Sequence, residues 1–414
     1  MAIPTVISKN SLNELYEATV HEVLEKGKEV NVRGTKSLEL HPCILHLTNP
    51  MNRTLVFPRR GNNPFATLFE TLWVLSGTNS IEHLKFFLPR AADFSDNGTE
   101  WRAGYGFRIF NWSKTGEDIN TGNGIDQFYQ VFMRLAVFDE YSRQAIITLW
   151  DPAHDYQENL RDYPCSNHLA FLRRGNKLDL TVTIRSNDAL WGMSSINVYE
   201  FTVMQEIMAK MLGIEVGEYY HIANSMHLYT HGYNADKNLP NVKKSIYLMD
   251  RSGEVKRGFF GFPILLEIGK EVMEYMHVQG VKPFEFKTIQ NNPGACFLKD
   301  DNNYTATMED YRKVYKITCD MIDAPTLADM ENIFNSHIRE VANSYLLNYM
   351  FLYIIYTKYG DTPAFRREWE YISKQMPLTD LQVSAEYWLM KKTKEIEPHD
   401  YRAAVDKCTT RKGV

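Results

Sequence analysis

The stretch YPCSNHLAFLRRGNKLDLTVTIRSNDALWG, from Tyr163 to Gly192, decides the fold. Two of its segments, 168–173 and 178–184, are short, apolar and bounded by turn residues, which predicts two strands. Residues 145–150 (AIITLW) predict a third strand just upstream. We therefore expect a sheet in the middle of the chain, with Cys165 between two of its strands.

Helical patterns surround this sheet. Apolar residues recur at helical spacing in three segments, and each has a boundary signal of the usual kind: a serine cap, a first-turn proline or a terminal glycine. Strands in the middle with helices around them predict an α+β domain in which helices cover one central sheet. The three segments are 12–27 after Ser11, 64–76 from Pro64, and 197–212 before Gly213.

The character of the chain changes after about Pro293-Gly294. Residues 306–322, 325–357 and 363–396 predict helices with tyrosine, methionine and tryptophan on their apolar faces. We therefore divide the chain into a catalytic domain, 1–294, and a helical C-terminal extension, 295–414.

Composition excludes several classes of protein. The 414 residues carry a formal charge of -5, which argues against a protein that coats nucleic acid. The 5 cysteines form no C-x-x-C pair, as in a reducing compartment without a zinc site. The start MAIPTVISKN lacks a secretory pattern, and the longest apolar run, 345–356, is too short to span a membrane. We expect a cytoplasmic protein, in the host cytoplasm if it is viral, with no membrane or nucleic-acid partner and no metal.

Cys165 is the candidate nucleophile. A thiolate attacks when nearby cations lower its pKa, and Arg185 is a candidate cation. An isolated cysteine is more often a small buried apolar residue, so the assignment depends on the surrounding phrases.

Those phrases form an ordered series. Pro164-Cys165 is followed by Arg185-Ser-Asn-Asp188, then Asn197, then Ile214-Glu-Val-Gly217 and Met226-His-Leu-Tyr229. In this order and spacing they resemble the core of the thymidylate synthase superfamily, and the resemblance covers about residues 12–290. Upstream phrases agree with it: Arg33-Gly34-Thr35, Glu70-Thr-Leu-Trp73, Gly77-Thr-Asn79, Tyr105-Gly106 and Ser142-Arg143.

The resemblance implies a covalent mechanism on a pyrimidine nucleotide. Cys165 would add to C6 of the base, so that C5 attacks the methylene group of 5,10-methylenetetrahydrofolate. Arg33, Arg185 and the Ser186 hydroxyl would hold the 5′-phosphate, together with Arg143 from the second subunit of a homodimer. Each arginine has the alternative of a surface ion pair.

The resemblance also assigns the remaining groups of the site. Asn197 would read uracil, because one amide both accepts from N3–H and donates to O4. His227 and Tyr229 would bond the 3′-hydroxyl, with a hydrogen-bonded core pair as the alternative. The other four assignments are Glu70 as proton carrier, Tyr105 near C5, Asp188 at the pterin ring and Trp73 beside folate.

Several departures favour the hydroxymethylase branch of the superfamily. Arg90–Asp96 stands where the family has two tryptophans, and Thr409–Val414 lacks its closing apolar tail. Both losses would admit water to the methylene on C5, where hydride otherwise gives thymidylate. Gln144, Ser166 and Ser225 also differ from the common residues.

We therefore expect 5-hydroxymethylation of dUMP, since Asn197 favours uracil and an aspartate would favour cytosine. Thymidylate synthase is the first alternative and dCMP or CMP hydroxymethylase the second. A non-catalytic module that binds nucleotide or messenger RNA is the third, although a binder needs no nucleophile.

Overall fold

The computed structural model describes most of the chain outside one long central segment. The predicted domain boundary at residues 294 and 295 and the chain end at Thr409–Val414 lie outside the described residues, so the division into two domains stays a prediction. The described residues are 4–55, 60, 62–112, 124–231, 240, 308–339, 341, 344–375 and 380–395.

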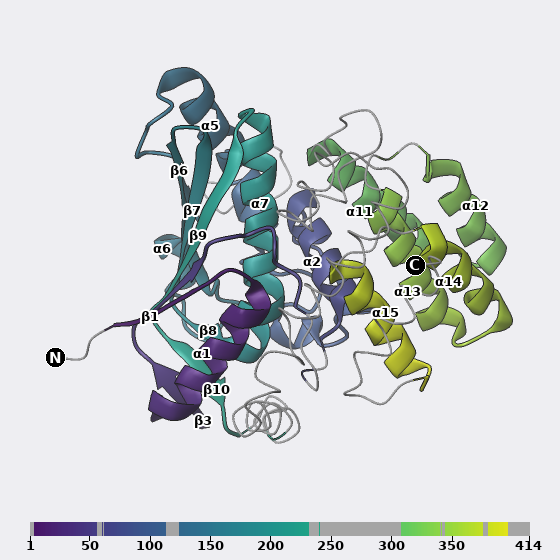
Figure 1. Cartoon of the computed structure of the whole chain (residues 1–414), viewed down its shortest axis with the longest axis horizontal. Helices are drawn as coiled ribbons and strands as arrows, with labels where there is room; N and C mark the ends of the chain where they lie inside the picture. The colour runs from purple at the N-terminus through teal and green to yellow at the C-terminus, as the bar shows by residue number, and fades with distance from the viewer. Residues whose placement is uncertain are drawn as a thin grey trace, which may run out of the picture.

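A mixed six-stranded sheet forms one side of the molecule (Figure 1). The strands predicted at 145–150, 168–173 and 178–184 are confirmed as its neighbours β5, β6 and β7. Two neighbouring pairs, β1–β4 and β7–β9, are parallel and the rest are antiparallel. In order across the sheet the strands are β1 (Thr5–Lys9), β4 (Cys43–Leu47), β9 (Glu215–Ala223), β7 (Lys177–Ile184), β6 (Ser166–Arg174) and β5 (Ile146–Thr148).

A second, four-stranded sheet, which the sequence analysis did not predict, carries part of the site. Its strands β8 and β10 are parallel and place His227 opposite Asp188. Arg33 (φ 52°) and Gly34 (φ 79°) form the two-residue turn of its hairpin, where positive φ at both positions matches the strand twist. Its order is β2 (Lys28–Val32), β3 (Thr35–Leu40), β10 (Met226–Tyr229) and β8 (Asn187–Asp188).

Three helices predicted from the sequence form as expected. In α1 (Leu12–Lys26) the side chain of Ser11 caps the first turn. Helix α2 (Pro64–Ser76) starts at its proline. Helix α7 (Val198–Met211) continues a wide π-helical segment, η3 (Ala189–Asn197), and is followed by Gly213 at φ 68°.

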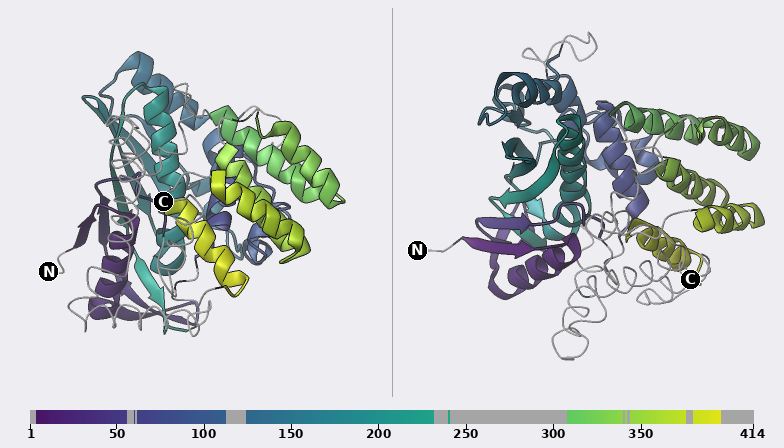
Figure 2. Two further views of the ribbon diagram at one scale, coloured as in Figure 1. Left: turned by 45° about the vertical axis from the view of Figure 1, so that its right-hand side comes forward. Right: turned by 45° about the horizontal axis from the view of Figure 1, so that its top comes forward.

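The helices stack in layers on the large sheet. Alternate residues of β7 are buried on the face along which α7 lies, and α2 packs on the far side of α7 (Figures 1 and 2). Shorter elements complete this half: α3 (Leu84–Phe87), η1 (Ala91–Phe94), α4 (Tyr105–Phe110), α5 (Gln127–Met133), η2 (Arg134–Phe138) and α6 (Pro152–Asp155).

The C-terminal region is helical, as predicted, but its helices are shorter. The segment 325–357 is not one helix and neither is 363–396; each is divided in two, and this corrects the prediction. The helices are α11 (Met308–Asp323), α12 (Leu327–His337), α13 (Ser344–Tyr359), α14 (Pro363–Gln375) and α15 (Asp380–Lys392).

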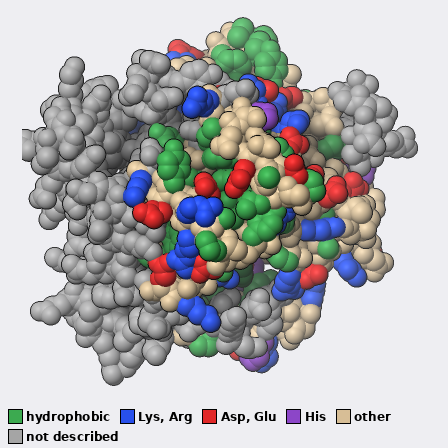
Figure 3. Space-filling view, turned by 90° about the vertical axis from the view of Figure 1, so that its right-hand side faces the viewer, with side chains coloured by type: hydrophobic (Ala, Val, Ile, Leu, Met, Phe, Trp, Pro, Cys, Tyr) green, Lys and Arg blue, Asp and Glu red, His purple; other side chains and the backbone are tan. Residues whose placement is uncertain are grey.

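These helices are packed directly on α2. Helices α11, α13 and α15 all contact it, and the Phe65 ring lies 5.1 Å from Tyr353 and 5.3 Å from Trp388, between ring centroids. The outer face of this region carries side chains of both charges, interspersed with hydrophobic ones (Figure 3). No helix among the described residues is long and apolar enough to cross a membrane.

Candidate active site

A cavity of about 340 Å³ lies where α2, α4, the loop before β6, the small sheet and the start of α7 meet. Most side chains proposed from the sequence line it. The lining includes Glu70, Trp73, Tyr105, Cys165, Ser186, Asp188, Asn197, His227 and Tyr229.

The three proposed phosphate-binding arginines do not line this cavity. Arg185 lies next to Cys165, the candidate nucleophile, because its Nε donates to the carbonyl of the preceding residue, Pro164, at 2.9 Å. Arg33 is exposed, and its guanidinium lies 5.8 Å from the ring centre of Tyr163, a lining residue. Arg143 is exposed just before β5. One chain therefore places two of the three arginines beside the site.

Cys165 stands immediately before β6, half-buried. Its carbonyl accepts from the Arg185 backbone N–H at 2.9 Å. This bond joins the residue just before β6 to the residue just after the neighbouring strand β7. Burial raises the pKa of the thiol; Arg185 acts in the opposite direction, and Asp162 adds to the rise. Arg185 thus lowers the pKa as expected, but burial outweighs it, and the ligand-free thiol is protonated at neutral pH.

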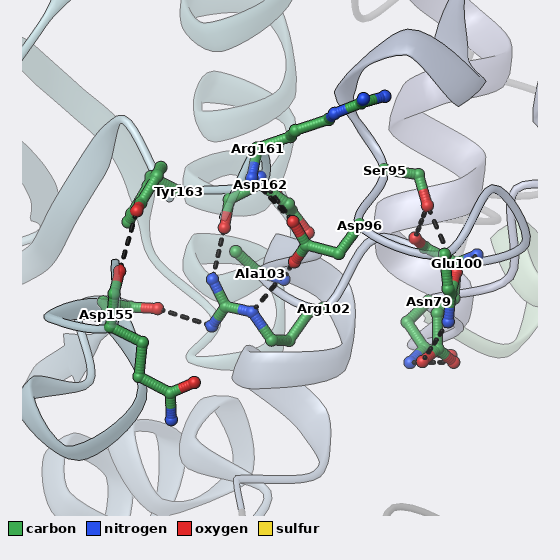
Figure 4. A network of polar contacts seen from close by, with 12 residues as sticks. Asn79, Ser95, Asp96, Glu100, Arg102, Ala103, Asp155, Arg161, Asp162 and Tyr163 are labelled. Carbon is green, nitrogen blue, oxygen red and sulfur yellow. Dashed lines mark hydrogen bonds and ion pairs between the residues drawn. The ribbon is translucent and has the colours of Figure 1, made fainter. Parts of the chain in front are cut away.

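A polar network fixes the loop before Cys165 to the loop that carries Arg102 (Figure 4). The Ala103 N–H donates to the Asp162 carboxyl at 2.7 Å, and Arg102 bonds both the Asp162 carbonyl and, at 3.3 Å, Asp96. Burial raises the pKa of Asp162 to about 6, with backbone and arginine contacts opposing it. The network therefore holds the loop before Cys165 and the Arg102 loop, which form two walls of the cavity, in a fixed relative position.

The opposite wall holds a chain of hydrogen bonds that runs in one direction. Burial lowers the pKa of His221 to about 3, so its ring is neutral. The bonding pattern then assigns Tyr219 as donor to His221 Nδ1 (2.9 Å) and His221 Nε2–H as donor to Asn187 Oδ1 (2.9 Å). Asn187 donates to Asn197 (2.9 Å), which donates to Glu200 (3.0 Å). The orientation of the Asn197 amide is therefore set before a ligand arrives.

Gly192 leaves the room that this chain needs. A Cβ at this position would lie 2.7 Å from Asn187 Nδ2 and 2.8 Å from Asn197 Oδ1. Such contacts are too short for real side chains, so only glycine lets the two amides meet here.

Three carboxyl groups face the cavity, and the surroundings favour the neutral form of each. Burial raises the pKa of Glu70 to about 8. Burial, and then the neighbouring Glu70, raise the pKa of Glu200 well above its usual range. Burial also raises the pKa of Asp188, although His227 opposes this. Sequence reasoning missed Glu200; its position three residues after Asn197, on the same helical face, was the available signal.

His227 and Tyr229 lie side by side on β10. Their rings meet edge to face with centroids 5.0 Å apart, and His227 Nδ1 bonds the Ser225 hydroxyl at 3.3 Å. His227 is only 6% exposed, yet both residues line the cavity. His227 is thus largely shielded from solvent, and a ligand in the cavity can still contact both side chains.

The aromatic wall differs from the expected one. Ala91 and Ala92 do not line the cavity, whereas Trp101 and Phe94 do. Trp101 packs edge to face on Trp73 with centroids 5.3 Å apart, and its indole N–H donates to the Ala91 carbonyl at 2.8 Å. Trp101 thus supplies an indole that sequence reasoning missed, and the reduced bulk beside folate at residues 90–96 stays a prediction.

Comparisons with known proteins identify the family of the chain. A family model described as thymidylate synthase matches residues 14–257. The chain therefore belongs to the thymidylate synthase family, and the resemblance noted in the sequence is confirmed.

Two kinds of relative are similar to the chain. The deoxyuridylate hydroxymethyltransferase of Bacillus phage SP01 is 34% identical over 223 residues, 54% of this chain and 58% of the relative. That of Delftia phage PhiW-14 is 30% identical over 235 residues, 54% of this chain and 62% of the relative. The thymidylate synthase of Bacillus licheniformis is 31% identical over 235 residues, 53% of this chain and 79% of the relative. The chain thus spans less than two thirds of both hydroxymethyltransferases.

Proposed function

We propose that this chain transfers a one-carbon unit from 5,10-methylenetetrahydrofolate to C5 of dUMP, and that water completes the reaction to give 5-hydroxymethyl-dUMP and tetrahydrofolate. The observation that carries the proposal is the cavity in which the Cys165 thiol, the oriented Asn197 amide and the Glu70 carboxyl come together. The names of the phage relatives support the hydroxymethyl product.

Cys165 would begin the reaction. Its sulfur adds to C6 of the base, C5 becomes nucleophilic, and negative charge develops on the C4 carbonyl oxygen. The Asn197 oxygen accepts from Asn187 but has a second lone pair, and its amide nitrogen donates to Glu200 but has a second N–H. The lone pair matches N3–H of uracil, and the N–H matches O4. Tyr105, which lines the cavity and whose hydroxyl accepts from the Ser166 N–H at 3.1 Å, would help to remove the C5 proton.

Binding of the nucleotide would involve two chains. Arg33, Arg185 and Ser186 bind the 5′-phosphate and the pair on β10 binds the sugar, while Arg143 comes from the partner subunit. The face of the large sheet opposite α7 supports a homodimer, because no helix in the described part of the chain lies along it (Figures 1 and 2). The exposed Arg143 lies next to the edge strand of this sheet.

Folate would occupy the aromatic side of the cavity. Trp73 and Trp101 offer apolar surfaces to a flat ring, and Asp188 offers a carboxyl that would bond the polar edge of the pterin. We propose no metal for the reaction. The described residues contain no group of three or more metal-ligating side chains.

Water, rather than hydride, would complete the transfer. Glu70 lines the cavity and has no hydrogen-bond partner in the part of the chain that the structure describes, so its carboxyl is available to hold a water molecule. Once C5 has lost its proton and the bond between the methylene carbon and folate has broken to release tetrahydrofolate, the water oxygen bonds to this carbon and the Cys165 thiolate leaves C6. The proton of the water passes to the fraction of Glu70 that is ionised, which a pKa of about 8 provides near neutral pH.

Mass spectrometry of the product tests the proposal. Purified protein with dUMP and methylenetetrahydrofolate, in water enriched in heavy oxygen, should give 5-hydroxymethyl-dUMP that carries one solvent oxygen on the C5 substituent. The folate product should be tetrahydrofolate. Thymidylate and dihydrofolate as the main products would show a thymidylate synthase instead, the alternative that the Bacillus licheniformis relative favours.

Two remaining alternatives have their own outcomes. Faster turnover of dCMP or CMP than of dUMP would assign a cytidylate hydroxymethylase and contradict the base reading by Asn197. Binding of dUMP without any covalent adduct at Cys165 would leave a non-catalytic nucleotide-binding module.

A further inference from the structure

Glu200 is the end of the hydrogen-bond chain that begins at Tyr219. It lies in the first turn of α7, is 1% exposed and lines the cavity. Its Oε1 accepts from Asn197, and its Oε2 is buried without a hydrogen-bond partner in the described residues. A buried oxygen without a partner is costly unless a ligand satisfies it.

The direction of the chain decides what Oε2 offers. Every link from Tyr219 to Glu200 donates toward Glu200, and the last acceptor is Oε1. If Oε1 is the carbonyl oxygen of a neutral carboxyl, Oε2 carries the proton, and the chain ends in a donor. An ionised Glu200 would instead leave a charged oxygen buried without a partner.

The groups around Glu200 favour this neutral state. Glu70 on α2 faces it, and the hydroxyls of Tyr105 on α4 and Tyr219 on β9 are close enough for their pKa values to be raised by it. The Asn197 N–H is the one contact that lowers the pKa of Glu200. No lysine or arginine in the described segments forms an ion pair with it. These surroundings, together with the unpartnered Oε2, favour the protonated carboxyl.

We propose that Glu200 is a second catalytic acid, whose Oε2–H donates a hydrogen bond to the C4 carbonyl oxygen of the bound uracil. This inference rests on the proposed function, because it needs a pyrimidine held against Asn197. When the Cys165 sulfur bonds to C6, the electron pair of the C5–C6 double bond moves toward the C4 oxygen, and Glu200 stabilises the charge there. The proton stays on Glu200, and no other reactant is required.

The same donor selects the base. Uracil presents an acceptor at position 4, whereas cytosine presents an amino group that cannot accept from Glu200. Glu200 and Asn197 together therefore favour uracil, and Glu70 is left for the water. The two carboxyls of the cavity would thus have separate tasks, as their different surroundings suggest.

Two substitutions at position 200 test the inference. Glu200→Gln keeps a neutral side chain with an acceptor for Asn197 and a weaker donor, so kcat should fall about tenfold while the KM for dUMP changes little. Glu200→Ala removes the donor, and kcat should fall roughly a hundredfold or more. In both variants the preference for dUMP over dCMP should narrow.

The pH profile separates this role from a structural one. Wild-type kcat should decline at high pH as Glu200 loses its proton, and this decline should be absent in Glu200→Gln. In Glu70→Gln the water also loses its proton acceptor, so kcat should be lower at every pH, and the remaining decline should lie at lower pH because the Glu70 carboxylate no longer raises the pKa of Glu200. Glu386→Gln, a matched change of a buried carboxyl that does not line the cavity, should leave the profile unchanged.

Three results would overturn the inference. A Glu200→Gln enzyme with wild-type kcat and pH profile would make the residue structural. A Glu200→Gln enzyme as inactive as Cys165→Ser would show an ionised base. Unchanged base preference in Glu200→Ala would remove the contact with position 4. Because kcat is taken from total product, a thymidylate product would contradict the proposed function without affecting this test.

Discussion

Helix α2 separates two halves of the molecule, and each half buries a glutamate. On the sheet side, Glu200 of α7 has one oxygen bonded to Asn197 and one without a partner in the described residues. On the helical side, Glu386 of α15 is 3% exposed, and both of its oxygens accept, from the Trp369 indole at 2.9 Å and from the Ser373 hydroxyl. The two carboxyls are similarly buried, but Glu386 has a donor for each oxygen and Glu200 has a donor for only one among the described residues.

This difference separates stability from reactivity. Glu386 joins α14 to α15 within an aromatic core, and its contacts leave no obvious place for a ligand. Glu200 and Glu70 instead face a cavity with raised pKa values, a state that costs stability in the free protein. The following predictions test whether the two halves divide in this way.

Loss of the nucleophile should have the largest effect. Cys165→Ser should lower kcat by at least about a thousandfold, because an alcohol is a far weaker nucleophile than a thiolate. Binding of dUMP, measured by calorimetry, should survive because the groups around the phosphate and base remain. Substantial turnover by this variant, or wild-type activity after thiol alkylation, would remove Cys165 from this role.

Loss of the structural carboxyl should affect stability alone. Glu386→Ala leaves two buried donors without an acceptor, so the free energy of unfolding should fall by about 2 to 4 kcal/mol. Urea unfolding measures the change. The kcat per folded molecule should equal that of wild type at low temperature; a specific loss of kcat would join the helical half to the catalytic site.

Base preference should respond to Asn197. Asn197→Asp removes the N–H that bonds Glu200 and offers a carboxyl that suits cytosine. Binding of dUMP should therefore become weaker and binding of dCMP stronger. A lost buried hydrogen bond of about 1 to 3 kcal/mol corresponds to a change of roughly tenfold to a hundredfold. Competition between the two nucleotides measures it. A wild-type preference for dCMP would refute the assignment.

Replacing Glu70 with glutamine should change the stability of the protein the least, and it should raise stability where Glu386→Ala lowers it. The folded-state pKa of about 8 exceeds the ordinary 4.5, so the folded chain holds a proton that the unfolded chain releases. This penalty is absent below about pH 4.5, grows as pH rises and is complete above about pH 8.

Glu70→Gln should therefore raise the melting temperature at pH 8 and leave it nearly unchanged at pH 5. We expect the free energy of unfolding to rise by roughly 2 kcal/mol at pH 8. This is less than the full pKa shift would give at about 1.4 kcal/mol per unit, because water in the cavity screens the charge. Equal melting temperatures of variant and wild type at pH 8 would show that Glu70 is not held in its neutral form.

Local signals in the sequence predicted the elements that position the site. Ser11, Pro64 and Gly213 mark helix ends at which the structure places them. The C-terminal boundaries were predicted less well. Pro377 could have divided 363–396, but neither proline nor glycine occurs between His337 and Ser344, so no local signal in the sequence separated α12 from α13.

The site was predicted as a set of residues rather than as an arrangement. The resemblance assigned roles to nine of the lining residues, but it gave no sign of the two-sheet geometry that places His227 beside Asp188. Trp101 and Glu200 were missed because they lie outside those phrases, and their roles depend on what packs against them. The net pKa of Cys165 was also out of reach, since burial is a property of the fold.

Gly192 gives the base-reading wall an unusual vulnerability. Its empty Cβ position is the space in which the Asn187 and Asn197 amides touch. Even Gly192→Ala, the smallest substitution, would act as a wedge between them and turn the Asn197 amide away from its set direction. Under the proposed reading of the base by Asn197, such a variant would keep its thiol but would discriminate less between uracil and cytosine nucleotides. The selectivity of the proposed reaction would then depend on one missing methyl group.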